Sequence, residues 1–133
     1  MSNKPQPSVQ SFLICREIFQ DTKTNANLLV SPFCRLNLPV FPATLPVSLY
    51  IQLTGGRGTY HFGIQLHDSE GRALADVLTP KEEALTDPVA YAQLTWRDMR
   101  LKFPRPGHYS LVVFADREEI GRHSLDVSLT IRK

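Results

Sequence analysis

Features that mark several specialised classes of protein are scarce in this sequence. It has two cysteines, one tryptophan and a formal net charge of only +2, from 15 lysines and arginines against 13 aspartates and glutamates. So small a net charge does not steer nucleic acid or a membrane surface toward the protein through a long-range field. We therefore do not expect nucleic acid as a partner, and any charged partner must be recognised by a local patch.

Long apolar runs are also absent. The longest runs from Leu111 to Ala115, whereas a membrane-spanning helix needs about twenty residues. A secretory leader is not expected, because the start of the chain is polar and its first apolar stretch, Phe12 to Cys15, is shorter than a signal-peptide core. We expect a cytoplasmic protein that does not insert into a membrane.

The two cysteines lie in apolar, strand-like segments and do not form a C-x-x-C pair. Free cysteine is among the residues most often buried, so we interpret Cys15 and Cys34 as two buried thiols in a reducing compartment. A disulfide between neighbouring strands is the alternative. A thiol count under denaturing, non-reducing conditions distinguishes the two.

The composition is that of one globular domain. The chain has 133 residues, of which 42% are hydrophobic and 21% are charged, close to the average for a domain that buries its own core. We assign residues 1–10 to a polar N-terminal arm and residues 11–133 to a single domain.

Alternation of apolar and polar residues dominates the chain and predicts strands with one face in a core. The pattern is clearest over Val47 to Leu53, Tyr60 to Leu66 and Leu125 to Ile131. Further strands are predicted over Phe12 to Phe19, Leu28 to Leu38, Met99 to Phe103, Tyr109 to Ala115 and, more weakly, Arg72 to Leu78. Seven to eight short strands favour a sandwich of two antiparallel sheets.

Turn residues mark the connections between these strands. Glycine accepts positive φ, so the run Thr54 to Thr59, which contains three glycines, predicts a hairpin. Asp68 to Gly71 and Asp116 to Glu119 predict two more hairpins. Pro104 to Gly107 ends one strand and begins the next.

Two segments depart from the alternation. In the segment 94–103 the apolar residues Leu94 and Trp96 occupy even positions, whereas those from Met99 to Phe103 occupy odd ones. A bulge or turn is therefore expected at Arg97 and Asp98. The run Thr79-Pro80-Lys81-Glu82 has a capping hydroxyl, a proline at the first helical position and a glutamate three residues after the cap, which predicts a helix start. Asp87-Pro88 ends this helix, so the fold contains at most one short helix.

A set of motifs resembles a known family. The motifs are Cys15, Asp21-Thr22-Lys23-Thr24, Leu28-Leu29-Val30, Phe33, Phe41-Pro42, Leu53 to Tyr60 and Pro106-Gly107-His108-Tyr109. Together they resemble an uncharacterised bacterial family of similar length, a domain of unknown function, over most of the chain from Phe12 onward. The resemblance implies an all-β, immunoglobulin-like antiparallel sandwich and no assigned activity.

No group of residues has the spacing that catalysis or a metal site requires. A G-x-S-x-G nucleophile elbow is absent, and neither cysteine has an electropositive setting. His61 and His67 share one predicted strand face but lie about 20 Å apart, too far for one coordination sphere. Pairing of either with His108 or His123 across sheets stays open, although solvated histidines are the simpler interpretation. We expect no catalytic residue, no metal and no cofactor, and predict that the protein is not an enzyme.

Acidic residues also gather in two predicted turns, a pattern that calcium sites in sandwich loops share. They are Asp68 with Glu70, and Asp116 with Glu118 and Glu119. The D-x-D-x-D spacing of a calcium loop is absent. We therefore interpret these carboxylates as solvated turn residues.

One local charge feature remains. Residues 97–133 hold eight basic and five acidic residues, net +3, whereas residues 1–96 hold seven and eight, net −1. If alternate residues of 99–103 face the core, Arg100 and Lys102 project together, with Arg97 and Arg105 nearby and Trp96 beside them. We predict this group as a binding site and call its four cations the basic strip. The alternative is that these charges only keep a strand soluble and prevent edge pairing.

These patterns favour a non-catalytic intracellular binding or assembly module that acts through an unpaired edge strand or the basic strip. Its expected partner is an unidentified protein, and self-association is included. The alternative is a small-ligand module that binds carbohydrate or acidic lipid through Tyr50, Tyr91 and Trp96. A third hypothesis is an enzyme whose site assembles from distant residues, in a pocket lined by His61, His123 or the acids.

Overall fold

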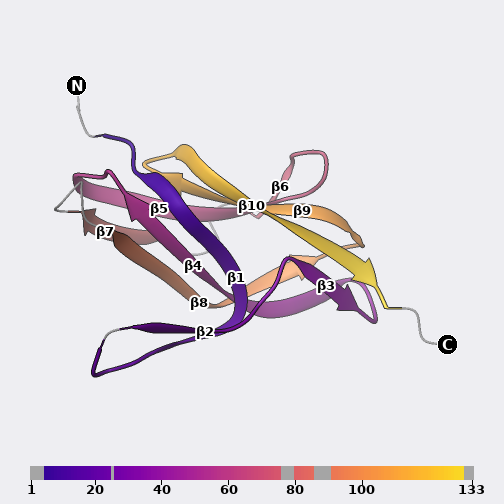
Figure 1. Ribbon diagram of the computed structural model, residues 1–133. Helices are drawn as coiled ribbons and strands as arrows, with labels where there is room; N and C mark the ends of the chain where they lie inside the picture. Colours follow the sequence, from indigo (N-terminus) through magenta and orange to yellow (C-terminus); the bar gives the residue numbers. More distant parts are fainter. Residues whose placement is uncertain (1–4, 25, 76–79, 86–90, 131–133) are drawn as a thin grey trace.

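The computed structural model describes residues 5–24, 26–75, 80–85 and 91–130. Within these residues it contains ten strands in two sheets, and no helix that could cross a lipid bilayer (Figure 1). The predicted all-β sandwich is confirmed. The strand count exceeds the predicted seven to eight because one predicted strand is divided in two and a short edge strand was not predicted.

The two sheets differ in size. The first sheet has the strand order β2 (Asn27–Pro32), β1 (Ser8–Gln20), β4 (Ala43–Thr54) and β8 (Ala92–Phe103). The second has the order β3 (Arg35–Leu38), β10 (Glu118–Leu129), β9 (Gly107–Ala115), β5 (Gly58–His67) and β6 (Ala73–Ala75), with β7 (Lys81–Leu85) also on β5. All pairings are antiparallel except that of β3 with β10. The first three residues of β1, Ser8 to Gln10, lie in the expected polar arm.

The connections and one corner make the sandwich immunoglobulin-like. Among the described strands the chain changes sheets repeatedly. Two of these crossings, from β4 to β5 and then from β8 to β9, join long core strands, as in Greek-key sandwiches. At the second crossing the Tyr109 hydroxyl donates a hydrogen bond to the Arg105 carbonyl at 2.5 Å. The Tyr109 ring meets Phe103 edge-on, with ring centroids 5.1 Å apart. This is the tyrosine corner of immunoglobulin-like domains.

The core lies between the two sheets and consists of the alternating apolar residues. Its largest fully buried side chains are Trp96, Tyr60, Phe62, Phe103, Ile14, Leu49, Ile51, Leu53, Ile64, Leu66, Leu94 and Leu101. Burying one such aliphatic or phenyl side chain contributes about 1.5–3 kcal/mol. The core faces predicted for Val47 to Leu53 and Tyr60 to Leu66 are confirmed. In the last strand Leu125 and Val127 are buried as predicted, whereas Leu129 is exposed and Ile131 lies outside the described residues.

The predicted bulge in β8 is confirmed. Leu49 of β4 pairs with Trp96, whereas Val47 pairs with Met99, so β8 has one extra residue between the two pairs. Asp98 adopts a φ of 56° there, and its amide donates to the Ser48 hydroxyl at 3.4 Å. The extra residue turns Met99 into the core after Trp96.

The predicted hairpin at residues 54–59 is wrong, because β4 and β5 belong to different sheets. The segment crosses between the sheets, with φ of 85° at Gly55 and 113° at Gly58. The Tyr60 hydroxyl accepts a hydrogen bond from the Arg57 amide at 2.9 Å and lies 2.5 Å from the Pro5 carbonyl. These contacts hold the crossing against the start of the chain.

The other two predicted hairpins are confirmed. Asp68 to Gly71 joins β5 to β6, and the Gly71 amide donates to the Asp68 carbonyl at 3.0 Å. Asp116 and Arg117 join β9 to β10, with φ of 49° and 71°. Two successive positive φ values are typical of the tight turn that suits twisted antiparallel strands.

The predicted short helix is wrong within the described residues. Lys81 to Leu85 form β7, which pairs antiparallel with the first half of β5. A helix of one or two turns is marginal on its own, whereas β7 gains ladder hydrogen bonds and buries Leu85. Thr79 and Asp87-Pro88 lie outside the described residues, as does the end of the predicted strand Arg72 to Leu78, of which β6 is the described part.

The predicted strand Leu28 to Leu38 is divided between the two sheets. Ser31 adopts a φ of 54°, and the chain then passes from β2 to β3 through Phe33 and Cys34. Cys34 is exposed in this link, so its predicted burial is wrong. Cys15 is buried as predicted, and both thiols are free.

Strands β1 and β2 form a hairpin that projects from the sandwich (Figure 1). β1 pairs with β4 only as far as Cys15 and then continues along β2. The hairpin is tied back to β8, since the Asn27 side-chain amide donates to the Gln93 Oε1 at 2.6 Å. In chain order, the hairpin lies between the part of β1 that pairs with β4 and strand β3 of the second sheet.

Candidate functional site

The basic strip lies along an edge strand of the first sheet. Arg97, Arg100, Lys102 and Arg105 are all exposed, on β8 or directly after it. Arg100 and Lys102 project from the same outer face, because Met99, Leu101 and Phe103 between and beside them are buried. Two residues along a strand place these cations about 7 Å apart.

The only carboxylate within residues 97–105, all of which are described, is that of Asp98, which is exposed at the bulge between Arg97 and Arg100. The residues opposite Arg100 and Lys102 on β4 are Pro46 and Thr44, both uncharged. Among the described residues, no ion pair joins Arg97, Arg100 or Lys102 to a carboxylate. The outer face of β8 therefore presents cations that are open to a partner.

Arg105 lies at the end of the strip nearest to Asp68. The Arg72 amide donates to the Asp68 carboxylate at 3.0 Å, and this bond is the main reason that the pKa of Asp68 lies below its usual value. The Glu70 amide and the charges of Arg72 and Arg105 lower the same pKa. Arg105 is thus partly engaged by the turn between β5 and β6.

Trp96 is not part of the surface. Its side chain is only 1% exposed, so the prediction that it lies beside the cations on the surface is wrong. Lys81 of β7 covers the ring, with the Lys81 Nζ 5.2 Å from the ring centroid, and donates to the Thr95 carbonyl at 2.5 Å. This contact, which we call the Lys81 latch, joins the edges of the two sheets.

The backbone edge of β8 is open beyond the Lys81 latch. Within the described part of the chain, β8 pairs only with β4. Lys81 occupies the Thr95 carbonyl, in the first half of the strand. The second half, from Met99 to Phe103, thus combines outward cations with an edge that pairs with no described strand.

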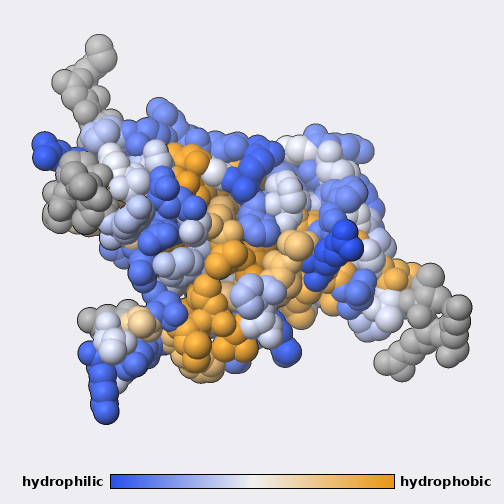
Figure 2. Space-filling model, in the orientation of Figure 1, coloured by the Kyte–Doolittle hydropathy of each residue, from blue (hydrophilic) through white to orange (hydrophobic). Residues whose placement is uncertain are grey.

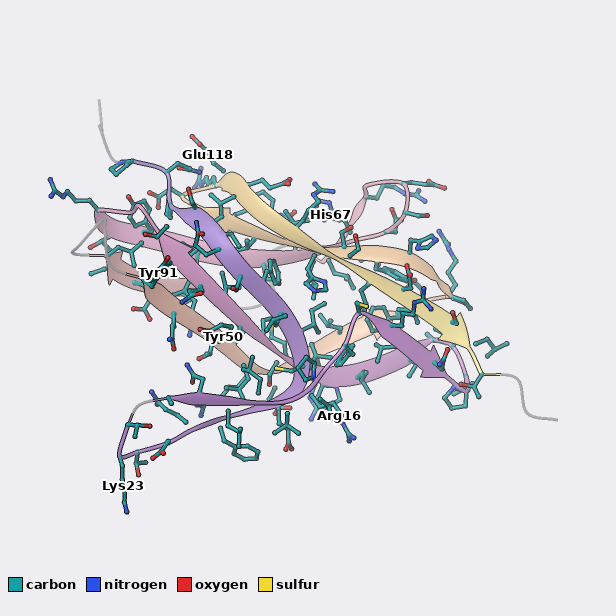
Figure 3. The ribbon with its side chains drawn as sticks, in the orientation of Figure 1. Arg16, Lys23, Tyr50, His67, Tyr91 and Glu118 are labelled. Carbon is teal, nitrogen blue, oxygen red and sulfur yellow. The ribbon has the colours of Figure 1, made fainter. Side chains whose placement is uncertain are left out.

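The aromatic residues proposed for a small ligand do not form one platform. Tyr91 is 64% exposed at the start of β8, whereas Tyr50 is half-buried on β4. Tyr50 is opposite Thr95 of β8, which is four residues, or about 13 Å, along the strand from Tyr91. The two tyrosines lie apart in Figure 3. With Trp96 in the core, no stacking surface for a sugar results from these three.

The four histidines are dispersed. His61 borders an open hollow of about 620 Å³ with Phe114 and Asp116, and its Nδ1 lies 3.6 Å from the Glu82 carboxylate on the exposed surface. The ring of His123 packs on Phe12, with centroids 5.5 Å apart. Among the described residues, no three histidine, cysteine or acidic side chains are grouped so that they could hold a metal.

A second charged group was missed by the sequence analysis. His108 contacts the carboxylate of Asp126 through its Nδ1, and Arg35 Nε lies 4.0 Å from the same carboxylate. The three residues belong to β9, β10 and β3 and line a hollow of about 610 Å³. No local pattern could reveal it, because the group depends on the order of three strands.

The chain is similar in fold to part of a larger enzyme of known structure. A β-glucosidase from Listeria innocua, in complex with glucose, has a TM-score of 0.51 and 14% identity, and the match covers 96% of this chain but 16% of the enzyme. At that identity the likeness shows the fold alone. An immunoglobulin-like protein from Pseudomonas aeruginosa is 13% identical over 95% of this chain and 99% of its own, with a TM-score of 0.41. No curated protein matches the sequence.

The family assignment comes from a family model that matches residues 10–128, nearly the whole sandwich. The matched region includes the tyrosine corner at Tyr109, the basic strip and the β1–β2 hairpin. The chain therefore belongs to the family of unknown function DUF6941, and it folds as an immunoglobulin-like β-sandwich.

Proposed function

We propose that the protein is a non-catalytic interaction module whose β8 edge binds an extended, acidic segment of a partner protein. The observation that carries the proposal is the second half of β8, where exposed Arg100 and Lys102 flank an unpaired backbone edge. Strand addition supplies affinity through main-chain hydrogen bonds, and alternate side chains supply specificity. The cytoplasmic location favoured by the sequence is part of this proposal and is supported by the two free thiols.

The spacing of the cations defines the partner segment. A strand added to β8 presents every second side chain on the outer face, about 7 Å apart. Carboxylates at alternate positions would then lie beside Arg100 and Lys102. Each exposed ion pair contributes about 0.2–1 kcal/mol, and each main-chain hydrogen bond about 0.5–1.5 kcal/mol. We therefore expect a micromolar complex that weakens as salt screens the charges.

The test uses a short peptide of alternating glutamate and threonine, with a lysine and threonine peptide for comparison. We expect the acidic peptide to shift backbone amide resonances of β8 and to bind more weakly at high salt. The double variant Arg100→Glu with Lys102→Glu should weaken binding at least tenfold and leave the melting temperature nearly unchanged, since both side chains are exposed.

A matched control reverses two exposed cations at the opposite end of the sandwich, Arg57→Glu with Arg117→Glu, which changes the net charge equally. This control should retain binding apart from a small general charge effect. An equal loss of affinity for the acidic peptide in the two double variants would show that binding depends only on net charge, which would contradict the proposal. Unchanged affinity in the β8 variant, or tighter binding of a single-stranded oligonucleotide than of the acidic peptide, would refute the proposal.

A further inference from the structure

An exposed leucine of β6 lies next to the end of the basic strip. Leu74 is 39% exposed. It lines a hollow of about 250 Å³ together with Pro104, Arg105 and Tyr109. Pro104 and Arg105 directly follow Phe103, the last residue of β8. The hollow therefore begins where the second half of β8 ends, at the edge to which the proposed partner segment binds.

The order of strands along β5 explains why β6 lies there. β7 pairs with residues 58–62 of β5, and β6 pairs with Leu66 and His67. Lys81, which is opposite Phe62, contacts the first half of β8 through the Lys81 latch. The second half of β8 then continues along the same side of the sandwich toward β6. On this side β8 is the described edge of the first sheet, and β6 is the described edge of the second.

A strand added to β8 has one face toward the solvent and one face toward the second sheet. Arg100 and Lys102 are exposed, whereas Leu101 and Phe103 are buried. Side chains that lie directly opposite each other on paired strands point to the same face of the sheet. The acids of the partner segment, which face the two cations, therefore alternate with residues that point inward. The inward residue opposite Phe103 is the one nearest to the hollow.

The walls of the hollow suit an apolar side chain. The Tyr109 hydroxyl donates to the Arg105 carbonyl at 2.5 Å, and the Asp68 carboxylate accepts two amides of its own turn. Neither group needs a bond from a ligand, and Leu74 and Pro104 add apolar contact. Figure 2 shows a mostly hydrophilic surface over the turn between β5 and β6, which borders the hollow. The volume is below the roughly 300–1,000 Å³ of small-molecule pockets, so the hollow has room for one side chain.

We propose that this hollow is an anchor pocket for an aliphatic side chain of the partner segment, the inward-facing neighbour of the acid that faces Lys102. The inference rests on the proposed function and specifies the partner further, because acidic residues must alternate with aliphatic ones. Charge then holds the outer face of the added strand, and burial of the partner side chain against Leu74 holds its inner face. The pattern applies to either direction of the added strand, since an inward residue lies on both sides of every acid.

The experiment compares the binding of two peptides to the full chain by calorimetry. One is the alternating glutamate and threonine peptide, and in the other valine replaces every threonine. Valine and threonine are both β-branched and favour extended backbone, so the two peptides differ mainly in the polarity of their inward face. We expect the valine peptide to bind about fivefold more tightly, as burial of roughly one further methyl group predicts. Nuclear Overhauser contacts should join a valine methyl group of the peptide to Leu74.

Equal affinities of the two peptides would overturn the anchor pocket and leave the proposed function intact. If neither peptide binds, both proposals fail. The comparison of peptides on the wild type needs no variant, so it tests the pocket even if a substitution in β6 loosens that short strand.

The variant Leu74→Ser tests whether the hollow supplies the preference for valine. It should remove most of this preference and leave the affinity for the threonine peptide unchanged. The matched control, Leu129→Ser, makes the same change at a leucine that is 49% exposed on β10, which β9 and β5 separate from β6. A valine preference that persists in Leu74→Ser, or that Leu129→Ser removes equally, would overturn the proposal.

Discussion

Replacement of Lys81 by methionine tests whether the Lys81 latch stabilises the sandwich. Methionine keeps most of the apolar stem, so the change removes the hydrogen bond to the Thr95 carbonyl and the charge over the Trp96 ring. A hydrogen bond from a charged group contributes about 1.5–3 kcal/mol, and a partly exposed cation over an aromatic ring about 0.5–1 kcal/mol. Water can replace the lost donor at this edge, so we expect a loss of about 2 kcal/mol, near the low end of the sum.

For a domain of this size, a loss of about 2 kcal/mol lowers the melting temperature by roughly 6–10 °C. Urea unfolding followed by fluorescence is well suited to the measurement, because Trp96 is the only tryptophan in the chain. The matched control is Lys102→Met, the same chemical change at an exposed position of β8. Equal unfolding midpoints for the wild type and Lys81→Met, or an equal loss in the control, would refute the reasoning.

Three further predictions follow from single contacts. Gly56→Ala should destabilise the fold by about 1 kcal/mol in urea titrations, because the new Cβ would lie 2.4 Å from Leu85 Cδ1 and the leucine must move; an unchanged midpoint contradicts this. In the folded protein Cys34 should react rapidly with a thiol reagent, whereas Cys15 should react only after unfolding, since it is buried and burial raises its pKa. Rapid reaction of both cysteines in the folded protein contradicts this. The pKa of Asp68 is lowered in the folded state, so its stabilisation is present above the unfolded value of about 3.9 and is lost as the pH falls through the folded pKa. The free energy of unfolding of Asp68→Asn should therefore fall less than that of the wild type as the pH drops below about 4. An equal fall in the two proteins contradicts this.

Alternation alone predicts much of the core. The even-to-odd change between Trp96 and Met99 locates the bulge at Asp98, because a single extra residue exchanges the two faces of a strand. The same parity also predicts that Trp96 faces inward with Leu94, which agrees with its burial and not with a place on the surface. The outward direction of Arg100 and Lys102 follows from the same rule.

Sheet membership could not be read from local patterns. The glycine-rich run before β5 has the residues of a hairpin, yet it crosses between sheets, because the partners of β4 and β5 are distant in sequence. Lys81 to Leu85 have a helix-start signal but gain more by pairing with the free edge of β5. The contact between His108 and Asp126, and the exposure of Phe19 and Leu28, likewise depend on tertiary arrangement.

The position of the β1–β2 hairpin has a consequence for protein engineering. It leaves the sandwich after Cys15 and returns at β3, so its length and sequence can change while every strand of the two-sheet body keeps its neighbours. Exchanging it between two proteins with this body transfers whatever the segment contacts without requiring a new scaffold.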